Sequence, residues 1–228
     1  MSRQLTFELP VRAAQGRDDF FVSPSNAEAL AALDAPDGWP MGKCLLVGPD
    51  GSGKSHLAAV WAQTHAARLT GAAELVGADM AALAQSRALV VEDADRIAGN
   101  QAGETALFHL HNLALASGAR LLLTARSAPR EWGLALADLA SRMEATALAR
   151  LQPPDDALLA AVLVKLFADR QIAAPPTLIA YLVTRIDRSF AAARAIVAAL
   201  DARALAEGRP VGRALAADML DLPPPPAQ

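Results

Sequence analysis

Short runs of consecutive apolar residues recur through the first two thirds of the chain, separated by polar turns. The clearest runs lie at residues 43–47, 88–91 and 121–124, and weaker ones lie near residues 74–76 and 145–148. Runs of this kind are typical of strands that are buried on both faces of a parallel sheet. Between them, apolar residues recur with the period of an amphipathic helix. We expect these helices at residues 27–33, 56–68, 79–85, 104–116 and 134–143.

The pattern changes at residues 151–155, Leu-Gln-Pro-Pro-Asp, after which only helical periodicity remains. The 228 residues are enough for one large domain, or for a domain of about 150 residues with a smaller companion. We predict an α/β fold, in which a P-loop parallel-sheet nucleotide domain is followed by a small all-α lid domain. The expected later helices lie at residues 155–170, 176–186, 189–206 and 212–220. The predicted divisions are an N-terminal segment at 1–17, the αβ domain at 18–150, the helical domain at 151–222 and a proline-rich tail at 223–228.

Composition and charge argue against several classes of protein. The apolar fraction of 53% is typical of a compact globule, although alanine, which favours helix but fills little volume, supplies much of it. No apolar run approaches the length of a membrane span and the N-terminus lacks a signal-peptide core, so we expect a cytoplasmic protein with no membrane partner. The one cysteine, Cys44, lies in an expected strand, which favours a buried apolar role. Because the net charge is −3, we expect protein partners and no direct sequence-specific DNA binding.

Residues 48–55 read Gly-Pro-Asp-Gly-Ser-Gly-Lys-Ser and fit the phosphate-loop pattern G-x-x-x-x-G-K-[ST] at every fixed position. An expected strand precedes them and an expected helix follows, which argues against an ordinary glycine-rich turn. In such a loop backbone N–H groups surround the phosphates, Lys54 reaches the terminal phosphates and Ser55 can bind Mg²⁺. The positive end of the following helix faces the same anion. The predicted nucleotide-binding residues are Gly48, Pro49, Asp50, Gly51, Ser52, Gly53, Lys54, Ser55 and His56.

Polar side chains follow two of the expected buried strands. Glu92 and Asp93 come directly after the run at residues 88–91, and Thr124 ends the run at residues 121–124. Beside a phosphate loop, acids at this place can hold Mg²⁺ through water and orient the attacking water. We assign the first role to Glu92, the second to Asp93, and sensing of the terminal phosphate to Thr124. The alternative is that these are merely solvated strand ends.

Two segments near the N-terminus carry further hypotheses. Phe21 and Val22 precede the phosphate loop by some twenty residues, where many ATPases hold the adenine, although they could be plain core. Residues 4–9 alternate apolar and polar side chains, which is typical of a short edge strand. A glutamine followed by leucine and an aromatic residue also resembles the peptide by which bacterial replication proteins bind the sliding DNA clamp. The predicted clamp-binding residues are Gln4, Leu5, Phe7 and Leu9.

Together these segments resemble AAA+ ATPases of the DnaA/Hda family over about residues 18–205. The resemblance rests on residues 20–26, on Gly-Lys-Ser-His-Leu at 53–57, on Leu-Thr at 123–124 with Pro-Arg-Glu at 129–131, and on Leu-Ala-Ser-Arg at 139–142. It implies ADP or ATP as cofactor, together with Mg²⁺. It also implies that Arg142 is an arginine finger for the nucleotide of a neighbouring subunit, the alternative being a surface arginine. Sensor 2, a helical-domain arginine that closes on the nucleotide, would be Arg194 or, as the alternative, Arg188.

The chain departs from the DnaA pattern in three places. Glu92 and Asp93 replace two aspartates, and the strand ends Thr124-Ala125-Arg126 where the family often has an acid, which argues against efficient hydrolysis by the chain itself. A proline-rich end stands where DnaA continues into a DNA-binding domain, so the chain most resembles the shorter Hda-type members.

The resemblance to Hda implies a regulator of replication initiation that binds the DNA polymerase III β sliding clamp on DNA and stimulates ATP hydrolysis by DnaA. It leaves open whether the chain is a homodimer. The alternatives are a helicase-loader ATPase related to DnaC or IstB, which would need a surface for single-stranded DNA, and a P-loop small-molecule kinase, which would need an arginine-rich substrate lid.

Overall fold

The computed structural model describes residues 21–220, and its centre is a five-stranded parallel sheet with the strand order β2-β3-β4-β1-β5. The three middle strands are almost entirely buried, as their apolar runs predict. Parallel strands need a crossover between them, and each crossover here contains a helix or a helical turn. The strands are β1 (Lys43–Val47), β2 (Arg68–Gly71), β3 (Ala88–Glu92), β4 (Arg120–Ala125) and β5 (Ala147–Arg150).

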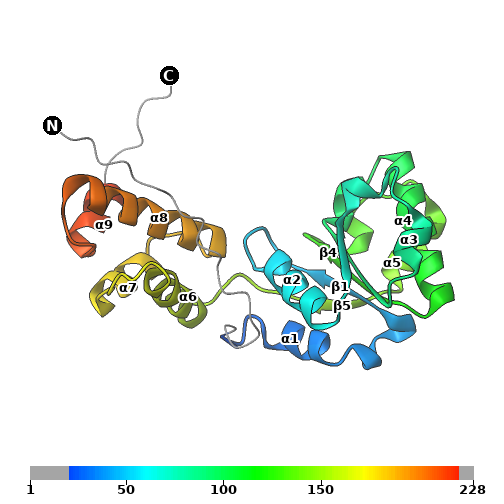
Figure 1. Cartoon of the computed structure of the whole chain (residues 1–228), viewed down its shortest axis with the longest axis horizontal. Coiled ribbons are helices and arrows are strands. Elements are labelled where there is room, and N and C mark those ends of the chain that lie inside the picture. Colours follow the sequence, from blue (N-terminus) through cyan, green and yellow to red (C-terminus); the bar gives the residue numbers. More distant parts are fainter. Residues whose placement is uncertain (1–20, 221–228) are drawn as a thin grey trace, which may run out of the picture.

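Alternate residues of the middle strands supply two separate hydrophobic cores. Leu45 and Leu123 belong to the core under α3, α4 and α5, whereas Leu46 and Leu122 belong to the core under α1 and α2. This division follows from the two-residue period of a strand. Figure 1 shows the two groups of helices on opposite sides of the sheet. Their bounds are α1 (Ala27–Asp34), α2 (Lys54–Thr64), α3 (Met80–Ala84), α4 (Gln101–Ser117) and α5 (Ala137–Glu144).

Beyond Leu151 the described chain contains only helices, which pack around a hydrophobic core of their own (Figure 1). Phe167, Leu182, Val197 and Leu200 are fully buried within this core. The helices are α6 (Asp156–Ala168), α7 (Pro176–Val183), α8 (Phe190–Glu207) and α9 (Arg213–Leu220). The α/β class with a helical C-terminal part is therefore confirmed. No helix within residues 21–220 is long and apolar enough to cross a membrane.

The predicted position of the second strand was wrong. β2 is Arg68–Gly71, and Ala72–Leu75 form a 3-10 turn instead. Helix α2 ends at Thr64, so the chain is already extended where helix was expected. The error has a physical cause. Among the described strands, β2 pairs only with β3 and has two exposed residues, and an edge strand of this kind carries no apolar run. The peptide Gln4-Leu5-Thr6-Phe7-Glu8-Leu9 and the proline-rich tail lie outside the described residues.

Candidate functional site

The predicted phosphate loop connects the end of β1 to the start of α2, at the carboxyl edge of the sheet. Gly51 and Gly53 have φ angles of 75° and 96°, in the left-handed region that favours glycine. A Cβ atom on Gly48 would lie 2.7 Å from Ser52 Oγ and 2.9 Å from Leu151 Cβ, so no larger residue fits there. The loop therefore has the backbone that a close approach to phosphate requires, and α2 begins immediately after it at Lys54.

Lys54 is buried and turns back onto the loop. Its Nζ atom donates to the carbonyl of Gly48 at 2.6 Å and to that of Pro49 at 2.9 Å. Burial lowers the pKa of this ammonium group, and the nearby carboxylates of Asp50, Asp93 and Asp95 oppose that effect. The ammonium group thus lies among three acids and can exchange its carbonyl partners for phosphate oxygens.

The polar residues predicted at the strand ends lie together beside the loop. The backbone N–H of Asp93 donates to Thr124 Oγ1 at 3.0 Å, and Thr124 is buried. Asp93 has a φ of 55° and its carboxylate pairs with Arg96 at 3.1 Å. The ends of β3 and β4 are therefore joined by a side-chain contact, as the assignment of Asp93 and Thr124 to one site requires.

The fit to Mg²⁺ rests on Glu92 and Ser55. The Oε1 atom of Glu92 is buried without a hydrogen-bond partner among the described residues, which suits a carboxylate that receives a cation or its water. Ser55 lies in the first turn of α2 and is exposed, and His56 beside it is half-buried. Across residues 21–220 no cluster of three or more acidic, histidine or cysteine side chains could hold a metal ion by itself. A metal here would need oxygens of the nucleotide as further ligands.

Helix α8 begins against the phosphate loop, a contact that the sequence did not reveal. The N–H of Phe190 donates to the carbonyl of Gly51 at 2.9 Å, and a Cβ atom on Gly53 would lie 2.7 Å from the Phe190 ring. Arg194, the predicted sensor 2, is one turn further along α8, exposed and in no ion pair within the described part of the chain. Arg188, the alternative, pairs with Asp156 at 2.7 Å. Of the two arginines, Arg194 is therefore the one whose guanidinium group no described carboxylate holds.

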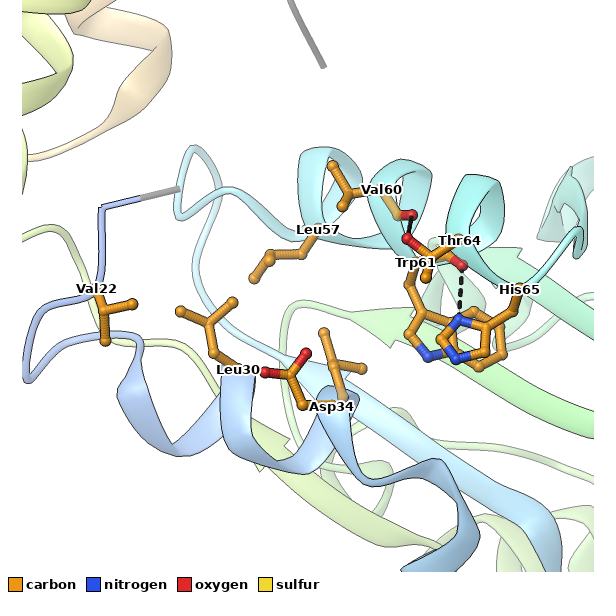
Figure 2. Close-up of a pocket in the computed structure, with 9 residues that line it drawn as sticks. Val22, Leu30, Asp34, Leu57, Val60, Trp61, Thr64 and His65 are labelled. Atoms are coloured by element: carbon orange, nitrogen blue, oxygen red, sulfur yellow. Dashed lines mark hydrogen bonds between the residues drawn. The ribbon is translucent and has the colours of Figure 1, made fainter. Parts of the chain in front are cut away.

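A pocket of about 190 Å³, lined by both apolar and polar side chains, lies between α1 and α2 (Figure 2). Val22, predicted on the adenine side, lines it together with Leu30 and Leu57, while Phe21 is half exposed and does not. Figure 2 shows the His65 ring stacked on the Trp61 ring at the far end, with ring centroids 4.4 Å apart. Since Leu57 stands only one turn after Lys54, the pocket begins beside the phosphate loop.

Arg142 lies at the end of the sheet where the strands begin, whereas the phosphate loop lies at the end where they finish. It belongs to α5, which leads into the start of β5, and β5 runs parallel to β1. The carbonyl of Arg142 accepts a hydrogen bond of 2.9 Å from Nζ of Lys43, the first residue of β1. A strand of this length spans about 13 Å, and the loop begins only after its far end. The guanidinium group lies over the Phe108 ring, 5.1 Å from its centroid.

Lys43 is a buried lysine that joins β1 to α4 and α5, and nothing in the sequence indicates this because it stands at the head of an apolar run. Only 2% of it is exposed, and its Nζ atom also lies 3.0 Å from Nε2 of His111, which is completely buried. Burial, with the charge of Lys43 next, lowers the pKa of His111 to about 4. His111 is therefore neutral at physiological pH, so its Nε2 atom can accept from the ammonium group. Thr146 Oγ1 donates to the carbonyl of Arg142 as well, at 3.0 Å, so the end of α5 is held from two sides.

No protein-family model matches the chain. Its structure is similar to domain III of the Thermotoga maritima replication initiation protein DnaA, with a TM-score of 0.79 and 18% identity over 93% of this chain and 98% of that one. It is also similar to AMPPCP-bound DnaA from Aquifex aeolicus, with a TM-score of 0.68 and 16% identity over 81% of this chain and 64% of that one. For Thermotoga maritima RuvB R170A the TM-score is 0.71 and the identity 17%, over 93% of this chain and 73% of that one. The chain therefore has the fold of DnaA domain III.

Proposed function

We propose that this chain is a nucleotide-binding regulator of chromosome replication initiation, which binds the DNA-loaded sliding clamp and stimulates ATP hydrolysis by DnaA. The observation that carries the proposal is the separation of the predicted arginine finger, Arg142, from the chain's own phosphate loop. The two lie at opposite edges of one sheet, joined by β1. An arginine at that edge would serve the nucleotide of another molecule.

Nucleotide binding is supported by the loop and by what surrounds it. The left-handed glycines, the buried Lys54 and the start of α2 form an anion site, and Thr124, Asp93 and Glu92 lie beside it. The pocket next to Leu57 would take the adenine, with Val22 on its wall. That DnaA from Aquifex aeolicus binds AMPPCP supports an adenine nucleotide as the ligand. We propose ADP or ATP, with Mg²⁺ held by Ser55 and Glu92.

The proposed role of Arg142 is to stabilise the charge that develops on the terminal phosphate of DnaA-bound ATP. Its guanidinium group is half-buried against Phe108, while its backbone is held by Lys43 and Thr146. A rigid backbone and an aromatic support keep an arginine in place without consuming its hydrogen-bond donors. Those donors would remain for the phosphate of the neighbouring subunit.

The clamp-binding part of the proposal rests on Gln4, Leu5, Phe7 and Leu9, which are outside the described residues. The peptide that contains these residues precedes α1 in the sequence. It would join the ATPase fold to the clamp and so bring Arg142 close to DnaA on the same DNA. We propose that the protein acts in the cytoplasm, through DnaA and the clamp and without reading a DNA sequence itself. A homodimer would place Arg142 against a second copy of the chain instead.

A single-turnover assay tests the proposal, with labelled ATP preloaded on DnaA in the presence of DNA-loaded clamp. Arg142→Ala should retain ADP affinity and clamp binding but lose stimulated hydrolysis, because a finger acts on transition-state charge. Fingers of this kind contribute about 10³ to 10⁵ in rate. Arg142→Lys should be impaired too, because lysine lacks the planar fork.

Arg87→Ala is the matched control, since Arg87 is exposed and precedes β3 at the same edge of the sheet. It should stimulate hydrolysis as well as the wild type does. If Arg142→Ala also stimulates fully, the proposed mechanism is wrong. A Gln4→Ala, Leu5→Ala double variant tests the clamp contact separately, and unchanged capture by the clamp would contradict that part alone.

A further inference from the structure

An ion pair connects the end of β4 to the phosphate loop. The Nε atom of Arg126 lies 3.2 Å from Oδ1 of Asp50, and the two side chains are 45% and 73% exposed. The backbone brings the partners together, because β4 is the neighbour of β1 and the N–H of Gly48 donates to the carbonyl of Ala125 at 3.2 Å. Arg126 is therefore the first residue after the strand residue that bonds the first glycine of the loop.

Arg126 is also a second cation near Lys54. Its backbone N–H donates to Oδ2 of Asp95 at 3.3 Å, which fixes its main chain beside the residues that follow β3. The charge of Arg126 acts on the Lys54 ammonium group, as do the carboxylates of Asp50, Asp93 and Asp95. Since Lys54 of a phosphate loop reaches the terminal phosphates, Arg126 stands at the end of the loop where those phosphates would lie.

We propose that Arg126 is a further phosphate-binding residue of this nucleotide site, and that Asp50 of the loop competes with the terminal phosphate for it. This inference rests on the proposed nucleotide binding. It assigns a role to a position where the sequence departs from its family pattern. The proposed ligand is a nucleoside triphosphate. The Arg126–Asp50 pair should discriminate it from a nucleoside diphosphate.

The exchange is favourable on electrostatic grounds. An exposed ion pair contributes little to stability, because water and salt screen it. A terminal phosphate carries more than one negative charge and presents several oxygens, and the guanidinium fork can bind two of them at once. Once Arg126 has left, the unpaired Asp50 carboxylate repels the phosphate, so the exchange is partly opposed and removal of the Asp50 charge should favour it. When the triphosphate binds, Arg126 therefore leaves the carboxylate for the phosphate.

The alternative is that the Arg126–Asp50 ion pair has a purely structural role and only stabilises the conformation of the loop. In that case removing either partner would loosen the loop and weaken binding of every nucleotide in the same way. The proposed exchange predicts opposite signs instead: loss of Arg126 weakens triphosphate binding, whereas loss of the Asp50 charge strengthens it. Opposite signs are the feature that a purely structural role does not produce.

The test is calorimetric titration of the full chain with AMPPCP and, separately, with ADP, each with Mg²⁺. Arg126→Ala should weaken AMPPCP binding about tenfold, a change equivalent to about 1.4 kcal/mol, and should weaken ADP binding much less. Asp50→Asn should strengthen AMPPCP binding. Arg130→Ala, which removes an exposed arginine in the turn after β4, should change neither affinity. Melting temperatures identify any variant that fails to fold.

Two results would overturn the inference while nucleotide binding stands. One is an equal effect of Arg126→Ala on AMPPCP and ADP, including no effect on either. The other is that Asp50→Asn binds AMPPCP more weakly than the wild type does. Lys54→Ala distinguishes failure of the proposed nucleotide site from failure of the proposed role of Arg126. If the wild type binds nucleotide and Lys54→Ala does not, the nucleotide site stands, and the Arg126 and Asp50 variants then test the exchange alone. If the wild-type chain binds neither nucleotide, the proposed function fails and this inference fails with it.

Discussion

The buried carboxylate of Glu104 offers a direct test of how the α5 region is held in place. Glu104 lies in the first turn of α4 and is only 1% exposed. Its Oε1 atom accepts from the N–H of Gly99 at 2.9 Å and from that of Ala135 at 3.2 Å. Its Oε2 atom accepts from the N–H of Leu136 at 2.7 Å, and Leu136 is the residue at which α5 is capped. One side chain thus joins the start of α4 to the loop ahead of the helix that carries Arg142.

Glu104→Gln retains the shape of this side chain but removes its charge and one acceptor. The amide oxygen can keep the bonds from Gly99 and Ala135, which become neutral and weaker by about 1 kcal/mol each. The amide nitrogen then faces the N–H of Leu136, and an unpaired buried donor costs about 1–3 kcal/mol. Together these losses should lower the free energy of unfolding by roughly 3–5 kcal/mol at pH 7.

Urea unfolding followed by circular dichroism measures this difference, with Glu144→Gln as the control. Glu144 is exposed at the end of α5, so its substitution should change stability by less than about 0.5 kcal/mol. A loss by Glu104→Gln no larger than that of the control would refute the reasoning.

The pH dependence gives a second check on Glu104. Burial alone would raise the pKa of this carboxyl, but the N–H groups of Leu136, Ala135 and Gly99 outweigh burial and lower it. A lowered pKa in the folded state means that the contribution is complete above the unfolded pKa of about 4.3. It is lost as the pH falls through the folded value. The gap between wild type and Glu104→Gln should therefore be constant near neutrality and narrow in acid, and a gap that persists unchanged in acid would contradict this account.

Two further predictions concern the ligand and the clamp. Lys54→Ala should weaken ADP binding at least about tenfold by calorimetry, since it removes the cation of the loop, and unchanged affinity would refute the phosphate-loop assignment. Deleting residues 1–10 should leave the melting temperature nearly unchanged but abolish capture by the sliding clamp. A truncated chain that still binds the clamp as tightly would rule out the docking peptide.

Much of the fold could be predicted because its signals are local. The strands β1, β3 and β4 are buried on both faces, so each appears in the sequence as a continuous apolar run. The phosphate loop is a contiguous pattern, and its neighbours are a strand and a helix. The exposed edge strand β2 has no such run, which is why its position could not be predicted.

The candidate site divides in the same way. Glu92, Asp93 and Thr124 could be placed together from the sequence, because parallel strands end at one edge of a sheet and the chemistry of each residue is evident. The sequence by itself thus determined the fold class, the position of the glycine-rich loop between β1 and α2, and the proximity of Asp93 and Thr124 at the strand ends.

Only the tertiary structure revealed the contacts that join distant segments. Lys43 meets the carbonyl of Arg142, Arg126 meets Asp50, and Phe190 meets Gly51. None of these pairs has a sequence pattern, because each depends on the order of the strands and on how the crossovers return the chain to the sheet. A lysine at the start of an apolar run carries no sign in the sequence that it is buried, but in the fold His111 of α4 and the carbonyl of Arg142 of α5 both become its partners. The physical reason is that burial and charge pairing are properties of neighbours in space.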